Sequence, residues 1–331
     1  MDKLKLSVDI IIPTYHPDDQ FYKLLGKLLR QTVKTVDKAE KTESEYLNKI
    51  FIMNTEEEFF DNEKFQKACG GSNQVEVRHI TKQEFDHGGT RNFAASLSTS
   101  DIIMFMTQDA MPEDDRLIEN LIKPLKEEKV AVSYARQLPN EQAGEIERYT
   151  REFNYPNTSI YKSKKDIDTL GIKTYFCSNV CSAYKREIYM KLGGFVTQTI
   201  FNEDMIFASK IIQSGYIVAY ASEARVIHSH KYTYRQQFTR NFDLGVSQRQ
   251  YREIFENIKS ESEGIALVKK TAKHLIKKGK FYLIPDLVLQ SGFKYLGYKA
   301  GLRYEKLSNK TVRRFSMNKS YWDKCEKKAG N

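Results

Sequence analysis

A short apolar run that ends in a single carboxylate constrains the fold of this chain more than any other stretch. Residues 102–106 are Ile-Ile-Met-Phe-Met, Asp109 follows three positions later, and Pro112 then stops the strand. Such a run is typical of a central strand that a parallel sheet buries on both faces. Open α/β sheets bind ligands at the carboxyl ends of these strands. We therefore expect Asp109 at a ligand-binding edge, where it can bind Mg²⁺ or Mn²⁺ and the metal can hold a diphosphate.

Other apolar runs alternate with helical periodicity along the chain. Strands are expected at 8–12, 50–53, 75–80, 130–134, 178–184, 217–220 and 225–227, and helices at 21–30, 117–125, 185–192 and from 203 onward. Because strands alternate with helices, the sequence predicts an α/β fold with a parallel, doubly wound sheet. Residues 138–172 are polar and lack strong periodicity, so we expect them to form a long connection.

Polar side chains stand where three of these strands end. They are Pro13, Thr14 and Tyr15, then Asn54, Thr55 and Glu56, then Gln108 and Asp109. Adjacent parallel strands would bring the three loops into one crevice. Gly88 and Gly89 let backbone approach a ligand there, although a plain turn is an alternative, and Thr90 can cap the helix that follows. Arg91 adds a fixed charge with planar donors that suit a diphosphate, and no dinucleotide or P-loop fingerprint is present.

Two acids and two histidines are further candidates for the site. Asn202 is expected to cap a helix that has Glu203 and Asp204 in its first turn. These acids either complement the helix dipole or supply a carboxylate that acts as a general base. His228 and His230 are two residues apart on an expected strand, so they should point to opposite faces. We therefore expect at most one of the two to share a metal with Asp109.

The positive charge of the chain is concentrated in its last third. The net charge is +10, but residues 231–331 carry 23 basic and 9 acidic side chains, and the first 230 residues are net negative. Helices are expected from 232 to about 258, over 263–280 and over 284–302. A basic helix followed by an aromatic amphipathic one suits an anionic membrane surface, and a helical hairpin packed on the first domain is the alternative. The tail after residue 304 is polar and is expected to be loosely ordered.

The cysteines and the hydropathy of the sequence indicate the cellular compartment in which the protein is expected. The four cysteines, at 69, 177, 181 and 325, show neither CxxC pairing nor zinc-finger spacing. We expect buried free thiols in a reducing cytosol, although Cys177 and Cys181 could share a helix face. No apolar run reaches the roughly 18–20 residues that span a membrane, and we expect no signal peptide. The sequence therefore predicts a cytoplasmic protein, and its basic helices allow a place at the inner face of the cell membrane.

Four motifs in order resemble those of a known family. They are Val-Asp-Ile-Ile-Ile-Pro-Thr-Tyr at 8–15, the Asp109 motif, Gly-Gly-Phe at 193–195 and Asn-Glu-Asp at 202–204. Over roughly residues 6–250 the chain resembles the inverting glycosyltransferases of family 2. Its segments 85–92 and 107–112 are similar to those of bacterial rhamnosyltransferases of polysaccharide assembly.

The resemblance implies a GT-A fold, which is Rossmann-like with a mostly parallel central sheet flanked by helices. It implies a catalytic domain over 1–232, a basic amphipathic helical extension over 233–304 that faces the acceptor or the membrane, and a polar tail over 305–331. The implied reaction is inverting transfer of a sugar, favoured as L-rhamnose from dTDP-L-rhamnose, to a hydroxyl of a lipid-linked glycan. A UDP-hexose donor is the alternative. A non-catalytic protein that binds nucleic acid or phosphate is a hypothesis from another class, but the acidic first part disfavours a nucleic-acid partner.

The resemblance also assigns residues. Asp204, with Glu203 beside it, matches the catalytic base. Asp109 matches the second acid of a metal-binding DxD motif, and Thr107 stands in place of the first acid. His228 or His230 would supply a later ligand for Mg²⁺ or Mn²⁺. The donor would contact Pro13, Thr14, Tyr15, Asn54, Thr55, Glu56, Gly88, Gly89, Arg91, Asn92, Gln108 and Asp109.

Overall fold

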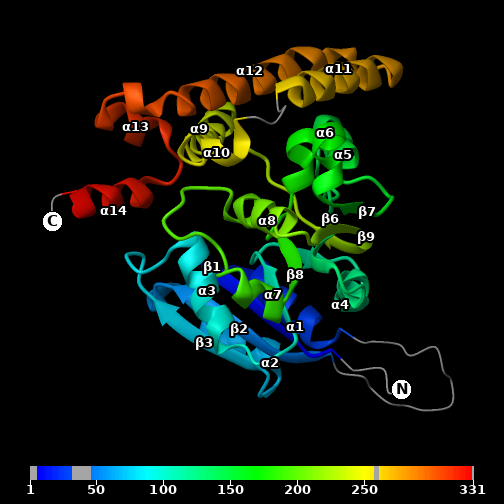
Figure 1. Cartoon of the computed structure of the whole chain (residues 1–331), viewed down its shortest axis with the longest axis vertical. Coiled ribbons are helices and arrows are strands. Elements are labelled where there is room, and N and C mark those ends of the chain that lie inside the picture. Colours follow the sequence, from blue (N-terminus) through cyan, green and yellow to red (C-terminus); the bar gives the residue numbers. More distant parts are fainter. Residues whose placement is uncertain (1–5, 32–45, 257–260, 330–331) are drawn as a thin grey trace.

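The computed structural model describes residues 6–31, 46–256 and 261–329, which form one mixed sheet, flanking helices and a helical C-terminal part (Figure 1). The strands are β1 (Val8–Tyr15), β2 (Leu47–Thr55), β3 (Val75–Ile80), β4 (Ile102–Met106), β5 (Met111–Pro112), β6 (Val130–Leu138), β7 (Ile160–Lys162), β8 (Cys181–Lys185) and β9 (Ile217–Ile227). The α-helices of the first part are α1 (Asp19–Leu29), α2 (Asn62–Cys69), α3 (His87–Leu97), α4 (Leu117–Ile122), α5 (Glu145–Asn154), α6 (Ile167–Leu170), α7 (Arg186–Lys191) and α8 (Glu203–Gln213). Those of the C-terminal part are α9 (Tyr234–Gln250), α10 (Arg252–Phe255), α11 (Glu261–Lys277), α12 (Ile284–Gly301), α13 (Asn309–Phe315) and α14 (Lys319–Ala329).

The strand order is β3-β2-β1-β4-β8-β6-β9-β5, and β7 pairs with β9. Strands β3, β2, β1 and β4 are parallel, and so are β6 and β9. The predicted mostly parallel sheet with flanking and C-terminal helices is confirmed. However, β8 runs antiparallel to β4 and β6, so the sheet is not purely parallel. An antiparallel neighbour needs no crossover connection. The segment between β6 and β8 can therefore bring the chain back along β6 in the opposite direction.

Alternation along the strands builds a core on each face of the sheet. Ile10 and Ile12 pack on one face with Leu24 and other residues of α1, and α4 contributes to the same cluster. Ile11 belongs to the cluster on the other face, which also holds residues of α3, α7 and α8, such as Phe207. Since successive side chains of a strand point to opposite faces, an uninterrupted apolar run is buried on both. This double burial fixes the strand ends on which the site is built.

Two segments that were expected to lack structure contain helices. Residues 138–172 include α5, β7 and α6, so the prediction of a plain connection is wrong there. The amphipathic α5 was missed because only Ile146 is buried among its long polar side chains, and this residue packs against Leu275 and Leu287 of the C-terminal part. The tail after residue 304 forms α13 and α14 instead of being loosely ordered. Val312 and Trp322 pack there in the cluster that contains residues of α9.

The three helices expected at the start of the C-terminal part are α9, α11 and α12, although residues 257–258 of the first prediction lie outside the described residues. The division of the chain at residues 232 and 304 stays a prediction. Cys69, Cys177 and Cys181 are buried free thiols, as expected, and Cys325 is exposed. Cys181 lies on β8, so it shares no helix with Cys177. Within the described ranges, no helix is long and apolar enough to span a bilayer.

Helices α9 and α12 pack at very short distance through glycines. A Cβ atom on Gly301 would collide with the carbonyl oxygen of Phe242, and one on Gly245 would collide with that of Tyr298. Gly292, on α12 as well, has no such neighbour within 4 Å. The same helix therefore has one face that requires glycine and one that does not.

This difference gives a test of the packing. We expect Gly301→Ala to lower the free energy of unfolding by about 2 kcal/mol, because the two backbones must separate to admit the methyl group. Gly292→Ala is the matched control, and it should raise stability by about 1 kcal/mol through helix propensity alone. Denaturant unfolding of both variants measures the effect, and equal changes in the two would contradict the packing.

Candidate functional site

A side-chain amide holds the carboxyl ends of β1 and β4 together. Gln108 accepts a hydrogen bond from the Tyr15 backbone nitrogen at 2.7 Å and donates one to the Tyr15 carbonyl oxygen at 3.0 Å. The Tyr15 ring is 44% exposed. The Lys82 ammonium lies 5.4 Å from the centre of this ring. An exposed aromatic ring beside a cation therefore lies at the edge of the sheet, where a flat ring of a ligand could stack on it.

The end of β2 joins the same edge through buried polar contacts. Thr14 donates to the Asn54 amide oxygen at 3.0 Å, and the Asn54 amide nitrogen donates to the Glu56 carbonyl oxygen at 3.1 Å. Glu56 has φ of 65°, and its carboxylate accepts a hydrogen bond from the Lys82 backbone. Thr14, Asn54 and Thr55 are buried, so they hold the edge in shape. The structure thus brings the three strand ends together, whereas their contact with a donor stays a prediction.

Asp109 lies within reach of both histidines that follow β9. Its Oδ2 atom is 3.4 Å from Nε2 of His228 and 3.1 Å from Nε2 of His230, and the two nitrogens are 3.0 Å apart. The expectation that only one histidine could face Asp109 is wrong, because β9 ends at Ile227 and the histidines do not follow strand geometry. Carboxylate and imidazole ligands bind metals at about 2.0–2.2 Å, so neighbouring ligand atoms about 3 Å apart suit one cation.

The electrostatics of this triad, Asp109, His228 and His230, also fit a cation. Burial raises the pKa of Asp109, but hydrogen bonds with the two histidines outweigh it and hold the pKa well below its usual value. Burial lowers the pKa of His228, which favours the neutral, metal-binding imidazole. Nδ1 of His228 lies 3.2 Å from the Gln137 amide oxygen, which Arg151 also contacts. This contact orients the ring so that Nε2 faces the carboxylate.

Glu203 and Asp204 lie in the first turn of α8, as predicted. Asp204 accepts a hydrogen bond from the Asn179 backbone nitrogen at 3.1 Å, and the Asn179 amide donates to Glu203 at 3.3 Å. The prediction that Asn202 caps this helix with its side chain is wrong. Its φ is 64°, and its side chain makes no cap hydrogen bond. The acids are therefore held by Asn179 from a neighbouring loop.

Arg91 pairs with Glu203 inside the protein. Its guanidinium is 3.4 Å from the Glu203 carboxylate and donates to the His87 carbonyl oxygen at 2.8 Å. Only 7% of the Arg91 side chain is exposed. The structure thus directs this cation toward the acid pair, and its predicted contact with a diphosphate stays untested. Burial raises the pKa of Glu203, but the charges of Arg91 and His87 and the hydrogen bond from Asn179 together outweigh burial and lower the pKa, which favours the ionised carboxylate.

The start of α3 differs from the prediction. The helix begins after Asp86, whose carboxylate accepts from the Gly89 backbone nitrogen at 2.7 Å. Thr90 therefore does not cap the helix. It lies one turn further on, where its hydroxyl accepts from the Asp86 backbone nitrogen at 3.0 Å.

Gly88 and Asn92 fix the loop that follows α7. A Cβ atom on Gly88 would collide with the Val196 carbonyl oxygen, so this glycine permits close packing of two backbones. Asn92 accepts from the Phe195 backbone nitrogen at 2.9 Å and donates to its carbonyl oxygen at 2.8 Å. Both residues were predicted to contact a donor, and the structure shows them in contact with protein backbone.

Residues 178–180 join the triad to the acid pair. Ser178 accepts from the Gln137 amide at 3.0 Å, and Gln137 in turn contacts the triad. The Val180 carbonyl oxygen accepts from the Thr107 backbone nitrogen at 3.1 Å, next to Asp109. Asn179, between them, binds both acids. One three-residue segment therefore places a candidate metal site and a candidate base beside each other.

Asn179 and Gln137 were missed from the sequence. Both are buried polar side chains, and Asn179 also accepts from Ser182 at 2.8 Å and Tyr184 at 3.0 Å. For Asn179 the available signal is a polar residue inside the strand expected at 178–184, because a buried amide must find hydrogen-bond partners. Gln137 lies beyond the strand expected at 130–134 and had no such signal. Those partners are distant in sequence, so the signal does not identify them.

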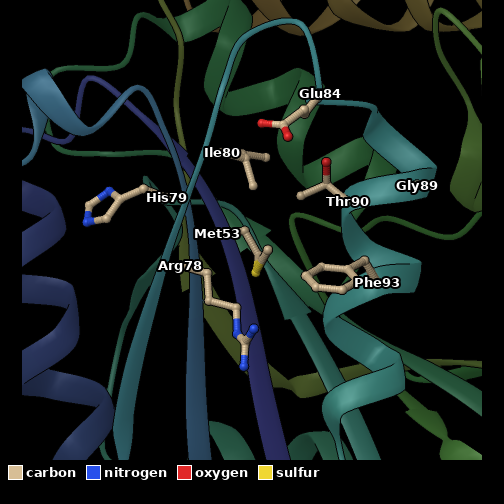
Figure 2. Close-up of a pocket in the computed structure, with 8 residues that line it drawn as sticks. All are labelled: Met53, Arg78, His79, Ile80, Glu84, Gly89, Thr90 and Phe93. Carbon is tan, nitrogen blue, oxygen red and sulfur yellow. The ribbon is translucent and has the colours of Figure 1, made fainter.

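Two hollows lie near the strand ends. Figure 2 shows the first, of about 530 Å³, between β3 and α3, where Phe93 and Arg78 face each other with 5.9 Å from guanidinium to ring centre. Of the predicted site residues, only Gly89 lines it. The second, of about 1290 Å³, extends from Glu56 and Lys82 to α13 and α14. The C-terminal helices therefore form a wall near the predicted donor residues.

The pKa of the Asp204 carboxyl group lies well above its usual value. Burial raises its pKa, the neighbouring charge of Glu203 raises it further, and the value is about 7. A carboxylic acid with a pKa near the working pH is suited to accept a proton in a reaction.

We therefore expect the catalytic rate to rise with pH through about 7, because Asp204 must lose its proton to act as a base. Glu203→Gln removes the adjacent negative charge, so it should move this limb of the pH–rate profile to lower pH. Exposed Glu187→Gln on α7 is the control and should leave the limb in place. A limb that stays in place or moves upward in Glu203→Gln would contradict this coupling.

Comparison with known proteins identifies the family of the chain. A family model described as glycosyl transferase family 2 matches residues 9–193. The O-antigen chain rhamnosyltransferase RfbN of Salmonella typhimurium (strain LT2) is 38% identical over 323 residues, which cover 97% of this chain and 98% of the relative. The O-antigen chain rhamnosyltransferase WbaN of Salmonella anatum is 43% identical over 249 residues, which cover 75% and 79%.

A solved structure shares the fold. It is the mannosyltransferase PcManGT from Pyrobaculum calidifontis in complex with GDP-Man and Mn²⁺, with a TM-score of 0.55 and 14% identity. The match covers 97% of this chain and 86% of that one. The predicted GT-A fold, including the C-terminal helices, is thereby confirmed.

Proposed function

The chain belongs to glycosyl transferase family 2 and is a glycosyltransferase, and on this premise we propose that it transfers L-rhamnose from dTDP-L-rhamnose. The acceptor in this proposal is a hydroxyl group of a lipid-linked glycan in cell-surface polysaccharide synthesis, at the cytoplasmic face of the membrane. The names of the two curated relatives support the choice of sugar.

One observation carries the mechanism. The segment 178–180 holds a half-buried carboxylate, Asp204, next to a triad of one carboxylate and two imidazoles. A sugar transfer with inversion needs one base for the acceptor and charge stabilisation for the leaving diphosphate. The two halves of the site match these two needs, and one base carboxylate without a separate nucleophile agrees with a single displacement.

In the proposed reaction, Asp204 takes the proton from the acceptor hydroxyl. The freed oxygen attacks the anomeric carbon on the side opposite the diphosphate, which leaves as the new glycosidic bond forms. Asn179 holds Asp204 in place through its backbone N–H, and Arg91 neutralises Glu203 so that two negative charges do not adjoin the incoming sugar. Asp109, His228 and His230 would hold Mg²⁺ or Mn²⁺, which supplies Lewis-acid stabilisation of the leaving diphosphate.

A panel of donors tests the proposal. Purified full-length protein is incubated with Mg²⁺ or Mn²⁺ and dTDP-L-rhamnose, UDP-hexoses or GDP-mannose, and release of nucleoside diphosphate is measured with and without a lipid-linked glycan fraction. We expect turnover of dTDP-L-rhamnose to exceed that of the other donors. Turnover of a UDP-hexose without turnover of dTDP-L-rhamnose would refute the choice of sugar but not the enzyme class.

A further inference from the structure

Helix α12 has an exposed apolar face over its middle part, residues 288–296. Val288, Leu289, Tyr295 and Leu296 are 48–59% exposed. Their spacing of one, seven and eight residues places them on one stripe of the helix. The opposite face of α12 carries Gly301 and packs on α9, so the apolar stripe points away from the protein body. Scattered exposed apolar residues are ordinary, but a continuous stripe marks a binding surface.

Two further features extend this stripe. Phe281 and Tyr282, in the turn before α12, are 67% and 66% exposed. Helix α11 lies beside α12, and Figure 1 shows the pair as an outer layer beyond α9 and α5. The side of α11 that packs inward is marked by the buried Leu275. We call the stripe of α12, the aromatic turn 281–282 and the exposed side of α11 the outer hairpin surface.

The exposed side of α11 is strongly basic. Its exposed lysines are Lys269, Lys270, Lys273 and Lys277, and the exposed Lys278 follows directly after the helix. The ammonium of Lys270 also lies 4.9 Å from the centre of the Phe153 ring of α5. Ile265 and Ile276 lie among them and are 59% and 60% exposed. Apolar and aromatic side chains that alternate with lysines suit the boundary between acyl chains and anionic headgroups.

We infer that the outer hairpin surface docks on an anionic lipid bilayer, an inference that rests on the proposed lipid-linked acceptor. Charge decides between this occupant and a second copy of the chain. Two copies that met through this surface would bring their lysine-rich α11 helices together, and like charges oppose such an interface. A bilayer with acidic headgroups attracts the same lysines and buries the apolar stripe.

The outer hairpin surface is connected to the part of the chain that carries the candidate metal site. Helix α9 begins at Tyr234, four residues after His230 of the triad. The Tyr234 hydroxyl donates to the Asp286 carboxylate of α12 at 2.6 Å, and its ring stacks on Phe293 with centroids 5.5 Å apart. The docked helix is thus tied to the start of α9, close in the chain to the candidate metal site. A lipid-linked acceptor would then reach the site from the membrane without leaving the bilayer surface.

Vesicle sedimentation of the full-length protein tests the inference. Vesicles of phosphatidylcholine alone are compared with vesicles that also contain phosphatidylglycerol, at low and high salt. We expect binding to the anionic vesicles that weakens with salt. The variants Leu289→Glu/Leu296→Glu and Lys269→Glu/Lys273→Glu should each weaken this binding by about tenfold or more.

Matched changes elsewhere serve as controls. Met190→Glu alters an exposed apolar residue on α7, and Lys126→Glu/Lys191→Glu reverses two exposed lysines outside the hairpin. These variants should bind as the unaltered protein does. Equal binding by the hairpin variants, or recovery of the unaltered protein entirely in the supernatant at low salt, would overturn the inference.

Donor hydrolysis and sedimentation velocity distinguish a failure of the membrane inference from a failure of the proposed function. Donor hydrolysis in the absence of lipid should be unchanged in the hairpin variants. A variant that loses vesicle binding but keeps this hydrolysis has lost membrane docking and retains an intact catalytic site. Vesicle binding without turnover of any nucleotide sugar would instead refute the proposed function. Sedimentation velocity reports the oligomeric state, and a dimer that Leu289→Glu/Leu296→Glu dissociates would overturn the inference and assign the surface to a second copy.

Discussion

Replacing Asp204 by asparagine lowers the rate of sugar transfer by about a thousandfold and leaves donor binding nearly unchanged, if Asp204 is the base that accepts the acceptor proton. Asparagine has almost the same shape and can still accept the hydrogen bond from the Asn179 backbone, so the local fold persists. What it loses is the ability to take a proton. The measurement is kcat for transfer, together with the dissociation constant for the donor.

The control for this experiment is Asp115→Asn, which alters an exposed aspartate in the segment before α4 and should leave both constants unchanged. The pH–rate profile adds a second criterion. The acidic limb near pH 7 should be absent from the residual activity of Asp204→Asn, because that limb reports the proton on Asp204. An Asp204→Asn enzyme with more than a tenth of the original rate would exclude Asp204 as the base.

The second large effect is expected at the triad. Asp109→Ala or His228→Ala removes one of three ligands that lie 3.0–3.4 Å apart. We expect each change to weaken Mn²⁺ binding by about a hundredfold or more and to lower donor turnover at least as much. Titration of the protein with Mn²⁺, followed by calorimetry or by the spin signal of free Mn²⁺, measures binding independently of activity.

Asp115→Ala is the control in this titration, because it removes an exposed carboxylate outside the triad. Partial rescue of Asp109→Ala turnover by high Mn²⁺ concentrations would support the assignment. If Asp109→Ala and His228→Ala bind Mn²⁺ as tightly as the unaltered protein, the three residues do not form the metal site.

The sequence predicted the first half of the sheet and the elements that carry the site. The run at 102–106 places Asp109 at a strand end by double burial alone, and the same argument applies to Tyr15 and Asn54. Because β1 lies between β2 and β4 and the three strands are parallel, their carboxyl ends meet at one edge of the sheet. The acids of α8 were found because carboxylates at a helix start form a local pattern.

What the sequence could not predict depends on contacts between distant residues. His228 and His230 both face Asp109 because the strand stops at Ile227, and strand ends are poorly marked in sequence. Asn179 holds the acid pair through a loop 24 residues away. Arg91 was assigned to a diphosphate from its charge, and the structure shows its nearest carboxylate partner to be Glu203. Packing, rather than residue type, decides each of these three contacts.

The helices of the polar tail have the same explanation. Trp322 and Val312 are isolated apolar residues in a basic sequence, so their periodicity is weak. They become ordered by packing in the cluster that includes Phe242 of α9. Most helical stability in proteins comes from such packing and not from local propensity.

The configuration of the transferred sugar tests the central claim most directly. The protein is supplied with dTDP-L-rhamnose, Mn²⁺ and a lipid-linked glycan fraction, and the anomeric configuration of the product is read from its NMR coupling constants. Direct displacement assisted by Asp204 predicts a rhamnoside whose configuration is opposite to that of the donor. A product with the donor's own configuration would contradict this mechanism, since retention requires a second displacement step and a group to receive the sugar first.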